Sequence, residues 1–159
     1  MINFDARKIQ LNESVSIDTV VDIAAPKGFY VADTAVAVVG RLKNTGKAFV
    51  LDAQADCQLK TACSRCLRPV DIGLSFHINE NFVDEDEAGE EDIGFVDNEI
   101  NLFPAVQRNL LLNIPMKPLC EMDCAGLCPK CGKNLNEGDC DCEGEINEQF
   151  RELLQMFND

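Results

Sequence analysis

Residues 49–59 read FVLDAQADCQL and decide the fold. From Asp52 to Lys60 every second side chain is polar, whereas the side chains of the other parity are apolar. The apolar set comprises Phe49, Leu51, Ala53, Ala55, Cys57 and Leu59. A period of two is typical of a β-strand with one buried face. We therefore predict a half-buried strand here.

Similar patterns lie on both sides of this strand. Ile72, Leu74, Phe76 and Ile78 alternate with polar residues and predict a second strand. Residues 34–42 are rich in Val and Ala, and residues 43–47 (KNTGK) suit a tight reversal into the first strand. The result is an antiparallel meander of at least three strands, to which residues 15–23 add a further candidate.

The sequence after the second strand changes character twice. Residues 84–92 are acidic and predict a loop. Residues from about 102 to 113 then have apolar side chains at helical spacing, with Asn101 as a cap and Pro104 in the first turn. We expect this helix to pack on one face of the sheet. Residues 1–118 thus form a mainly antiparallel sheet domain of α+β class.

Residues 119–159 form the second part of the chain. Six cysteines stand between Cys120 and Cys142 among Gly, Pro, Asp and Asn, with too few apolar residues for a core. Something other than hydrophobic burial must order this tail. Beyond it, apolar residues recur at helical spacing from Ile146 to Phe157 and predict a short amphipathic C-terminal helix.

Composition limits the kind of protein. The chain has 159 residues, enough for one domain with a small module, and a formal net charge of −14. Nine of the acidic residues stand between Asp84 and Glu99. So acidic a chain gains little binding free energy from contact with the phosphate backbone of a nucleic acid, and a basic partner is favoured. With no leader and no apolar run long enough to span a membrane, we expect a cytoplasmic protein without a membrane partner.

The nine cysteines therefore belong in a reducing compartment, where metal ligation is favoured over disulfides. Eight of them form close pairs: Cys63/Cys66, Cys120/Cys124, Cys128/Cys131 and Cys140/Cys142. Four pairs can supply two four-thiolate zinc sites. Spacing favours Cys128 and Cys131 with Cys140 and Cys142, which leaves Cys63 and Cys66 to meet Cys120 and Cys124 across the fold. Other pairings of Cys120 and Cys124 stay open. We predict one or two structural Zn²⁺ ions.

Two other functions fit parts of the sequence. Arg65 and Arg68 can lower a thiol pKa at Cys63 and Cys66, so this pair could act as a thiol redox switch or oxidoreductase. A strand meander is not, however, the βαβ context of thioredoxin-like sites. Basic residues near the cysteine pairs also suggest direct RNA binding by a zinc module. They are Arg65, Arg68, Lys117, Lys130 and Lys133. Cys57 is predicted to be a core thiol and His77 a surface residue.

Several motifs, in order, resemble those of the YceD family of large ribosomal RNA subunit accumulation proteins. They are CSRCLRPV at 63–70, LLLNIP at 110–115, LCEMDCAGLCPKCGKNLN at 119–136 and CDC at 140–142. The resemblance implies a role in accumulation or processing of 23S ribosomal RNA, without enzymatic activity or a small-molecule substrate. Our leading hypothesis is that the sheet domain, with its zinc-ordered tail, binds a large-subunit ribosomal protein or a precursor particle; a contact to ribosomal RNA is the alternative.

Overall fold

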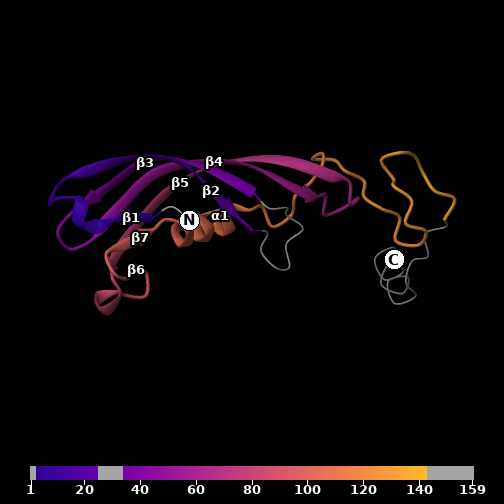
Figure 1. Cartoon of the computed structure of the whole chain (residues 1–159). Helices are drawn as coiled ribbons and strands as arrows, with labels where there is room; N and C mark the ends of the chain where they lie inside the picture. The colour runs from indigo at the N-terminus through magenta and orange to yellow at the C-terminus, as the bar shows by residue number, and fades with distance from the viewer. Residues whose placement is uncertain (1–2, 25–33, 143–159) are drawn as a thin grey trace, which may run out of the picture.

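Five strands form the main sheet of the computed structural model, which describes residues 3–24 and 34–142 (Figure 1). In spatial order they are β2 (Ser14–Ile23), β3 (Thr34–Asn44), β4 (Phe49–Ala62), β5 (Pro69–Asp84) and β6 (Ile93–Phe95). The strands β2 to β5 form the antiparallel meander that the alternation predicts, including the candidate strand at 15–23. The short β6 runs parallel to β5, so the sheet is mixed and not purely antiparallel.

The strand β4 shows why this sequence forms a sheet. Its apolar parity, from Leu51 to Leu59, is buried, and the polar side chains from Asp52 to Lys60 are exposed. The turn into β4 is closed by Thr45, whose N–H donates to the Ala48 carbonyl over 2.9 Å. Gly46 has a φ of 86°, which explains the need for glycine in this turn.

The buried face of the sheet is covered by one helix and a small second sheet. The helix α1 (Phe103–Asn113) lies beneath the main sheet in Figure 1. The strands β1 (Asn3–Asp5) and β7 (Glu99–Asn101) pair antiparallel beside it. The N-cap position is Leu102 and not the predicted Asn101, which lies one residue earlier; its Oδ1 accepts a hydrogen bond from the Phe103 N–H over 2.9 Å. The helix places Ala105, Val106 and Leu110 in the core.

A polar contact fixes the helix against β5. The carboxylate of Glu80 accepts hydrogen bonds from Arg108 Nη1 over 3.1 Å and from Asn109 Nδ2 over 2.6 Å. The Glu80 side chain is only 11% exposed, so these donors replace the water that burial removes. This contact sets where along β5 the helix lies.

Replacing Glu80 with Gln should therefore weaken helix docking. The amide keeps the size of the side chain but loses the charge that both donors contact, so we expect the free energy of unfolding to fall by about 1 to 2 kcal/mol. Urea unfolding measures this change. The matched variant is Asp56→Asn, an exposed carboxylate on the outer face of β4, which should change stability little. Equal effects of the two substitutions would contradict a docking role for Glu80.

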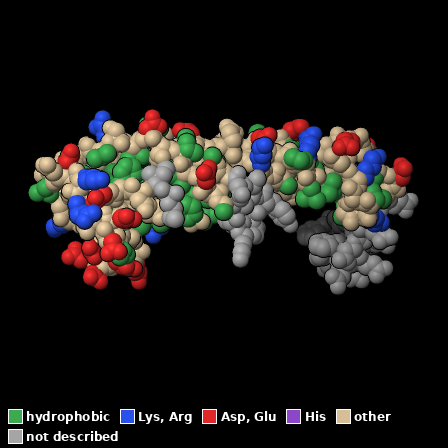
Figure 2. Space-filling view, in the orientation of Figure 1, with side chains coloured by type: hydrophobic (Ala, Val, Ile, Leu, Met, Phe, Trp, Pro, Cys, Tyr) green, Lys and Arg blue, Asp and Glu red, His purple; other side chains and the backbone are tan. Residues whose placement is uncertain are grey.

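The acidic stretch follows β5 directly. It contains the short 3-10 helix η2 (Glu85–Glu87), and Arg108 Nη1 also donates to the Glu91 carbonyl over 3.0 Å. Acidic side chains gather at this end of the molecule, far from the cysteine-rich end (Figure 2). Among the described residues no helix is long and apolar enough to cross a membrane. The predicted C-terminal helix lies outside the described residues.

Candidate metal centres

The turn between β4 and β5 presents the first pair of thiols. The Cys63 N–H donates to the Arg68 carbonyl over 2.8 Å, and the Leu67 N–H donates to the Cys63 carbonyl over 2.9 Å. These two bonds fold the backbone into a tight loop beneath the sulfurs of Cys63 and Cys66. A Cys-x2-Cys turn of this kind lets two thiolates converge on one metal ion.

The pair Cys128 and Cys131 repeats the same hydrogen-bond pattern. The Cys128 N–H donates to the Lys133 carbonyl over 2.8 Å, and the Gly132 N–H donates to the Cys128 carbonyl over 2.9 Å. The residue after the second cysteine has a positive φ in both turns, 73° at Gly132 and 60° at Leu67. The two turns therefore share one geometry, which Gly adopts readily and Leu adopts at a cost.

Substitutions at these two positions should have opposite effects on stability. We expect Leu67→Gly to stabilise the protein by up to about 1 kcal/mol, because relief of the left-handed conformation outweighs the greater flexibility of the unfolded chain. Leu67 is 66% exposed, so little burial is lost. Gly132→Ala should destabilise the second turn by about 1 kcal/mol. Thermal unfolding of both variants measures the difference, and a loss of stability in Leu67→Gly would show that the leucine side chain contributes to the fold.

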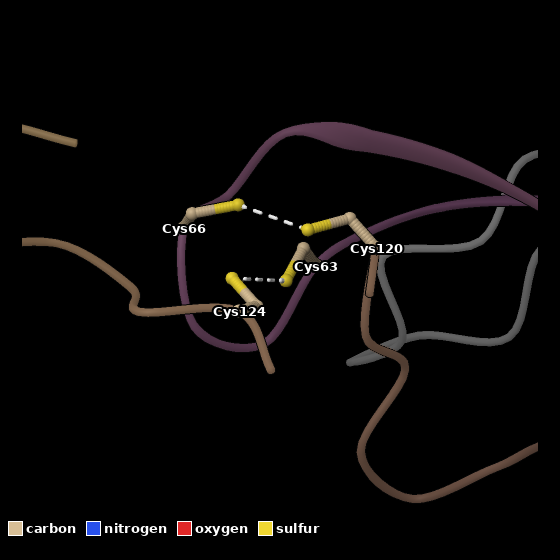
Figure 3. A group of neighbouring side chains, drawn as sticks. All are labelled: Cys63, Cys66, Cys120 and Cys124. Atoms are coloured by element: carbon tan, nitrogen blue, oxygen red, sulfur yellow. Dashed lines mark hydrogen bonds between the residues drawn. The ribbon is translucent and has the colours of Figure 1, made fainter. Parts of the chain in front are cut away.

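Four sulfurs meet where the β4–β5 turn contacts the tail. The group comprises Cys63, Cys66, Cys120 and Cys124, whose sulfurs all lie within 4.8 Å of one another (Figure 3). Cys63 Sγ is 3.8 Å from Cys124 Sγ, and Cys66 Sγ is 3.6 Å from Cys120 Sγ. Four sulfurs around a tetrahedral zinc ion with Zn–S bonds of about 2.3 Å are separated by about 3.8 Å. The geometry thus fits a four-thiolate zinc site.

Residues other than cysteine also donate hydrogen bonds to the sulfurs of this group. The Arg65 backbone N–H lies 3.4 Å from Cys63 Sγ, and Arg68 Nη2 lies 3.3 Å from Cys120 Sγ. Asn136 Nδ2 lies 3.4 Å from Cys124 Sγ. Such donors stabilise thiolates and fix their orientation toward a metal. Neither Asn136 nor the contact of Arg68 with Cys120 was predicted from the sequence.

Hydrogen bonds to backbone carbonyls join the tail to the turn. The Ser64 N–H donates to the Pro118 carbonyl over 2.8 Å, and Arg65 Nη1 donates to the Cys124 carbonyl over 2.7 Å. The Leu127 N–H donates to the Arg65 carbonyl over 3.2 Å. Gly126, with a φ of 80°, lies so close that a Cβ there would stand 3.3 Å from the Arg65 carbonyl oxygen. The first group is therefore a structural junction between sheet and tail.

The second group of sulfurs lies within the tail itself. It comprises Cys128, Cys131, Cys140 and Cys142, again with all sulfurs within 4.8 Å of one another. Cys128 is buried, Cys131 is exposed, and Cys140 and Cys142 are half-buried. In the first group only Cys120 is not fully buried. The second group is thus more open to solvent.

In each group the pKa of at least one thiol is lowered and the pKa of another is raised. The backbone N–H of Cys66 lowers the pKa of Cys63 to about 6, and the backbone N–H of Cys131 lowers the pKa of Cys128 to about 6. The Arg68 backbone N–H favours the Cys66 thiolate, but burial and the surrounding sulfurs outweigh it and raise the pKa of Cys66 to about 12. The Cys131 sulfur raises the pKa of Cys142 to about 12. Four adjacent thiolates repel one another, and a bound divalent cation removes that repulsion.

The structure thus brings all eight paired cysteines into two groups, each of which could hold a metal ion. Cys120 and Cys124 meet Cys63 and Cys66 and not another tail pair. Cys57 stays apart in the sheet core, where burial raises its pKa. His77 lies on the exposed face, with Nε2 2.9 Å from Asp52 Oδ1. Metal binding itself stays a prediction.

Comparison with known proteins gives one family. The model of the family described as "Large ribosomal RNA subunit accumulation protein YceD" matches residues 51–157. An uncharacterised protein of Mycobacterium bovis is 32% identical over 101 residues, which span 60% of this chain and 49% of that protein. An uncharacterised protein of Mycobacterium tuberculosis matches with the same identity and coverage. An uncharacterised protein of Mycobacterium leprae is 31% identical over 83 residues, which span 46% of this chain and 36% of that protein.

The chain therefore spans about half the length of the first of these relatives. No solved structure matches it significantly. The family match begins within β4 and includes both cysteine groups, so it covers the junction and the tail but not β2 or β3.

Proposed function

The chain belongs to the YceD family of large ribosomal RNA subunit accumulation proteins, and from this membership we propose that it is a non-catalytic ribosome-biogenesis factor. In this role it supports accumulation or processing of the 23S ribosomal RNA of the large subunit. The observation that carries the proposal is the match over residues 51–157, which includes both cysteine groups.

We further propose that each group binds one structural Zn²⁺ ion. Sulfur separations of 3.6 and 3.8 Å in the first group support tetrahedral zinc. Four thiolates leave no coordination position for a substrate, so zinc would order the chain without taking part in a reaction. Cys63 and Cys66 lie in this closed group, which favours their role as ligands over thiol redox chemistry.

Charge supports a basic protein as the direct partner. The chain carries a net charge of −14, and three of the basic side chains near the cysteines have intramolecular contacts. Arg65 bonds to the Cys124 carbonyl, Arg68 bonds to Glu121, and Lys133 bonds to the Asp139 carbonyl. A large-subunit ribosomal protein, free or within a precursor particle, therefore fits better than bare RNA.

Depletion of the protein in a bacterium that encodes it tests this function. We expect 23S ribosomal RNA to fall relative to 16S, and the wild-type chain and Cys57→Ala to restore it. Cys124→Ser, which removes a proposed zinc ligand, should fail to restore it at equal protein level. An unchanged ratio of the two RNAs on depletion would overturn the proposal.

Affinity purification with and without ribonuclease tests the proposed partner. Large-subunit ribosomal proteins should remain bound to the chain after the RNA is digested.

A further inference from the structure

The outer edge of β5 has almost no partner strand. On one side, β4 pairs with β5 along its length from Pro69 to Phe82. On the other side, β6 pairs only with Phe82–Asp84. Within the described ranges no strand pairs with this side of residues 69–81. Along this side of β5, a long row of backbone groups therefore has no partner strand among the described residues.

This edge lacks the features that prevent the sheets of natural proteins from pairing edge to edge. Such edges usually carry Lys, Pro within the strand, a bulge or a covering loop. After Pro69, residues 70–81 carry only two charged side chains, Asp71 and Glu80, and Glu80 is occupied by Arg108 and Asn109. The pairing of β4 with β5 continues without a bulge. The opposite edge strand, β2, carries the exposed charges Asp18 and Asp22 in a shorter length.

We propose that this edge pairs with the same edge of a second copy of the chain. The two β5 strands would run antiparallel around a twofold axis at Ser75, which is the midpoint of residues 69–81. Closed twofold dimers are the most common assemblies of identical chains. The pairing joins two sheets into one and satisfies backbone groups of both edges. It is an interaction beyond the proposed function and does not depend on it.

The register around Ser75 is self-complementary. Leu74 lies opposite Phe76, and Ile72 lies opposite Ile78, all on the buried face of the sheet. Ile72 and Leu74 are only half-buried in one chain and would gain apolar neighbours from the other. Asp71 lies opposite Asn79 and Glu80 opposite Val70, so no two like charges face each other.

Charge beyond the paired strands also favours a second copy. In an antiparallel pair, the β4–β5 turn of one chain approaches the end of β5 in the other. Arg68 of this turn is already paired with Glu121, but Arg65 bonds to a neutral carbonyl and so keeps its net positive charge. The end of β5 continues into η2 (Glu85–Glu87), which is wholly acidic. This local attraction offsets part of the repulsion between two chains of charge −14. An extended strand of another protein is the rival occupant.

Sedimentation of the full zinc-loaded chain over a range of concentrations tests the proposal. We expect a monomer–dimer equilibrium and a dissociation constant raised at least about tenfold by Ser75→Lys, because the new charge meets its own copy on the axis. Ser75 is exposed, so the monomer should fold normally. The control is Ser16→Lys, at an exposed position on the outer face of β2, which should dimerise like the wild type.

Mixing charge variants separates pairing from damage to the fold. Ser75→Glu should also be monomeric alone, whereas Ser75→Lys mixed with Ser75→Glu should form a heterodimer, since opposite charges then meet on the axis. Both variants lose the Gln54–Ser75 hydrogen bond, so its loss cannot explain why the mixture dimerises when each variant alone does not. A wild-type chain that stays monomeric at every concentration would overturn the proposal and leave the edge to another protein. Unchanged dimerisation of Ser75→Lys would overturn it as well.

Discussion

Replacing Cys124 with serine should release the tail from the sheet and lower the zinc content by about one ion per chain. Cys124 is 2% exposed and is one of the four sulfurs at the junction of tail and sheet. Besides its cysteines, the junction has among the described residues only Val70, Leu119 and Leu127 as partly buried apolar side chains. Metal binding, on the order of 10 kcal/mol for structural zinc in finger-sized peptides, is then its main source of order. Hydrogen exchange should show lost protection over residues 118–127, with protection retained in β2 to β5 and around the second group, which keeps its ion.

Two further variants show which group holds which segment. Cys131→Ser removes a ligand of the second group, so it should release one zinc ion and expose only the residues beyond Leu127. Cys57→Ala removes a cysteine that belongs to neither group and should retain both ions. If Cys131→Ser also lost strand protection, the tail would be part of the core of the sheet, and the division of the chain at residue 118 would be wrong.

Gly40→Ala should have the largest effect on the sheet. Gly40 of β3 pairs with Ala53 of β4, and a Cβ at Gly40 would overlap the Asp52 carbonyl oxygen and the Ala53 Cα. Both atoms belong to the backbone of the central strand, so rotation of a side chain cannot relieve the overlap. We expect the free energy of unfolding to fall by about 4 kcal/mol or more, a loss seen only with severe packing defects. Urea unfolding measures it.

Gly73 provides the matched control for Gly40. It is an exposed glycine on β5, and a Cβ there would meet only the side chain of Gln58, at 3.2 Å. Gly73→Ala should therefore change the free energy of unfolding by less than about 0.5 kcal/mol. Equal and small effects of the two substitutions would show that β3 and β4 do not approach so closely at Gly40.

The long strands were predictable because each one buries a single face. Alternation in the sequence marked β4 and β5, and the turn at residues 43–47 placed β3 beside β4. The short strands gave no such signal. Each of β1, β6 and β7 has three residues, too few for a period, and β1 pairs with β7 from the other end of the sheet domain, as Asn3 with Asn101. Their positions follow from tertiary packing, so the parallel pairing of β6 was missed.

The cysteine groups were predictable in part for a similar reason. Spacing in the sequence identifies the turns at Cys63/Cys66 and Cys128/Cys131, because each turn is local. It cannot say which distant pair shares an ion with Cys63 and Cys66, since that depends on where the chain after α1 leads. In the structure this chain reaches the β4–β5 turn at Pro118, which brings Cys120 and Cys124 to it. The contacts of Arg68 and Asn136 with sulfur depend on the same docking.

Zinc X-ray absorption on the purified full chain, with the metal content quantified, tests the central claim most directly. The account predicts two zinc ions per chain, each with four sulfur neighbours at about 2.3 Å and no nitrogen or oxygen ligand. A chain that carries iron in place of zinc, or zinc bound mainly through nitrogen and oxygen, would contradict it.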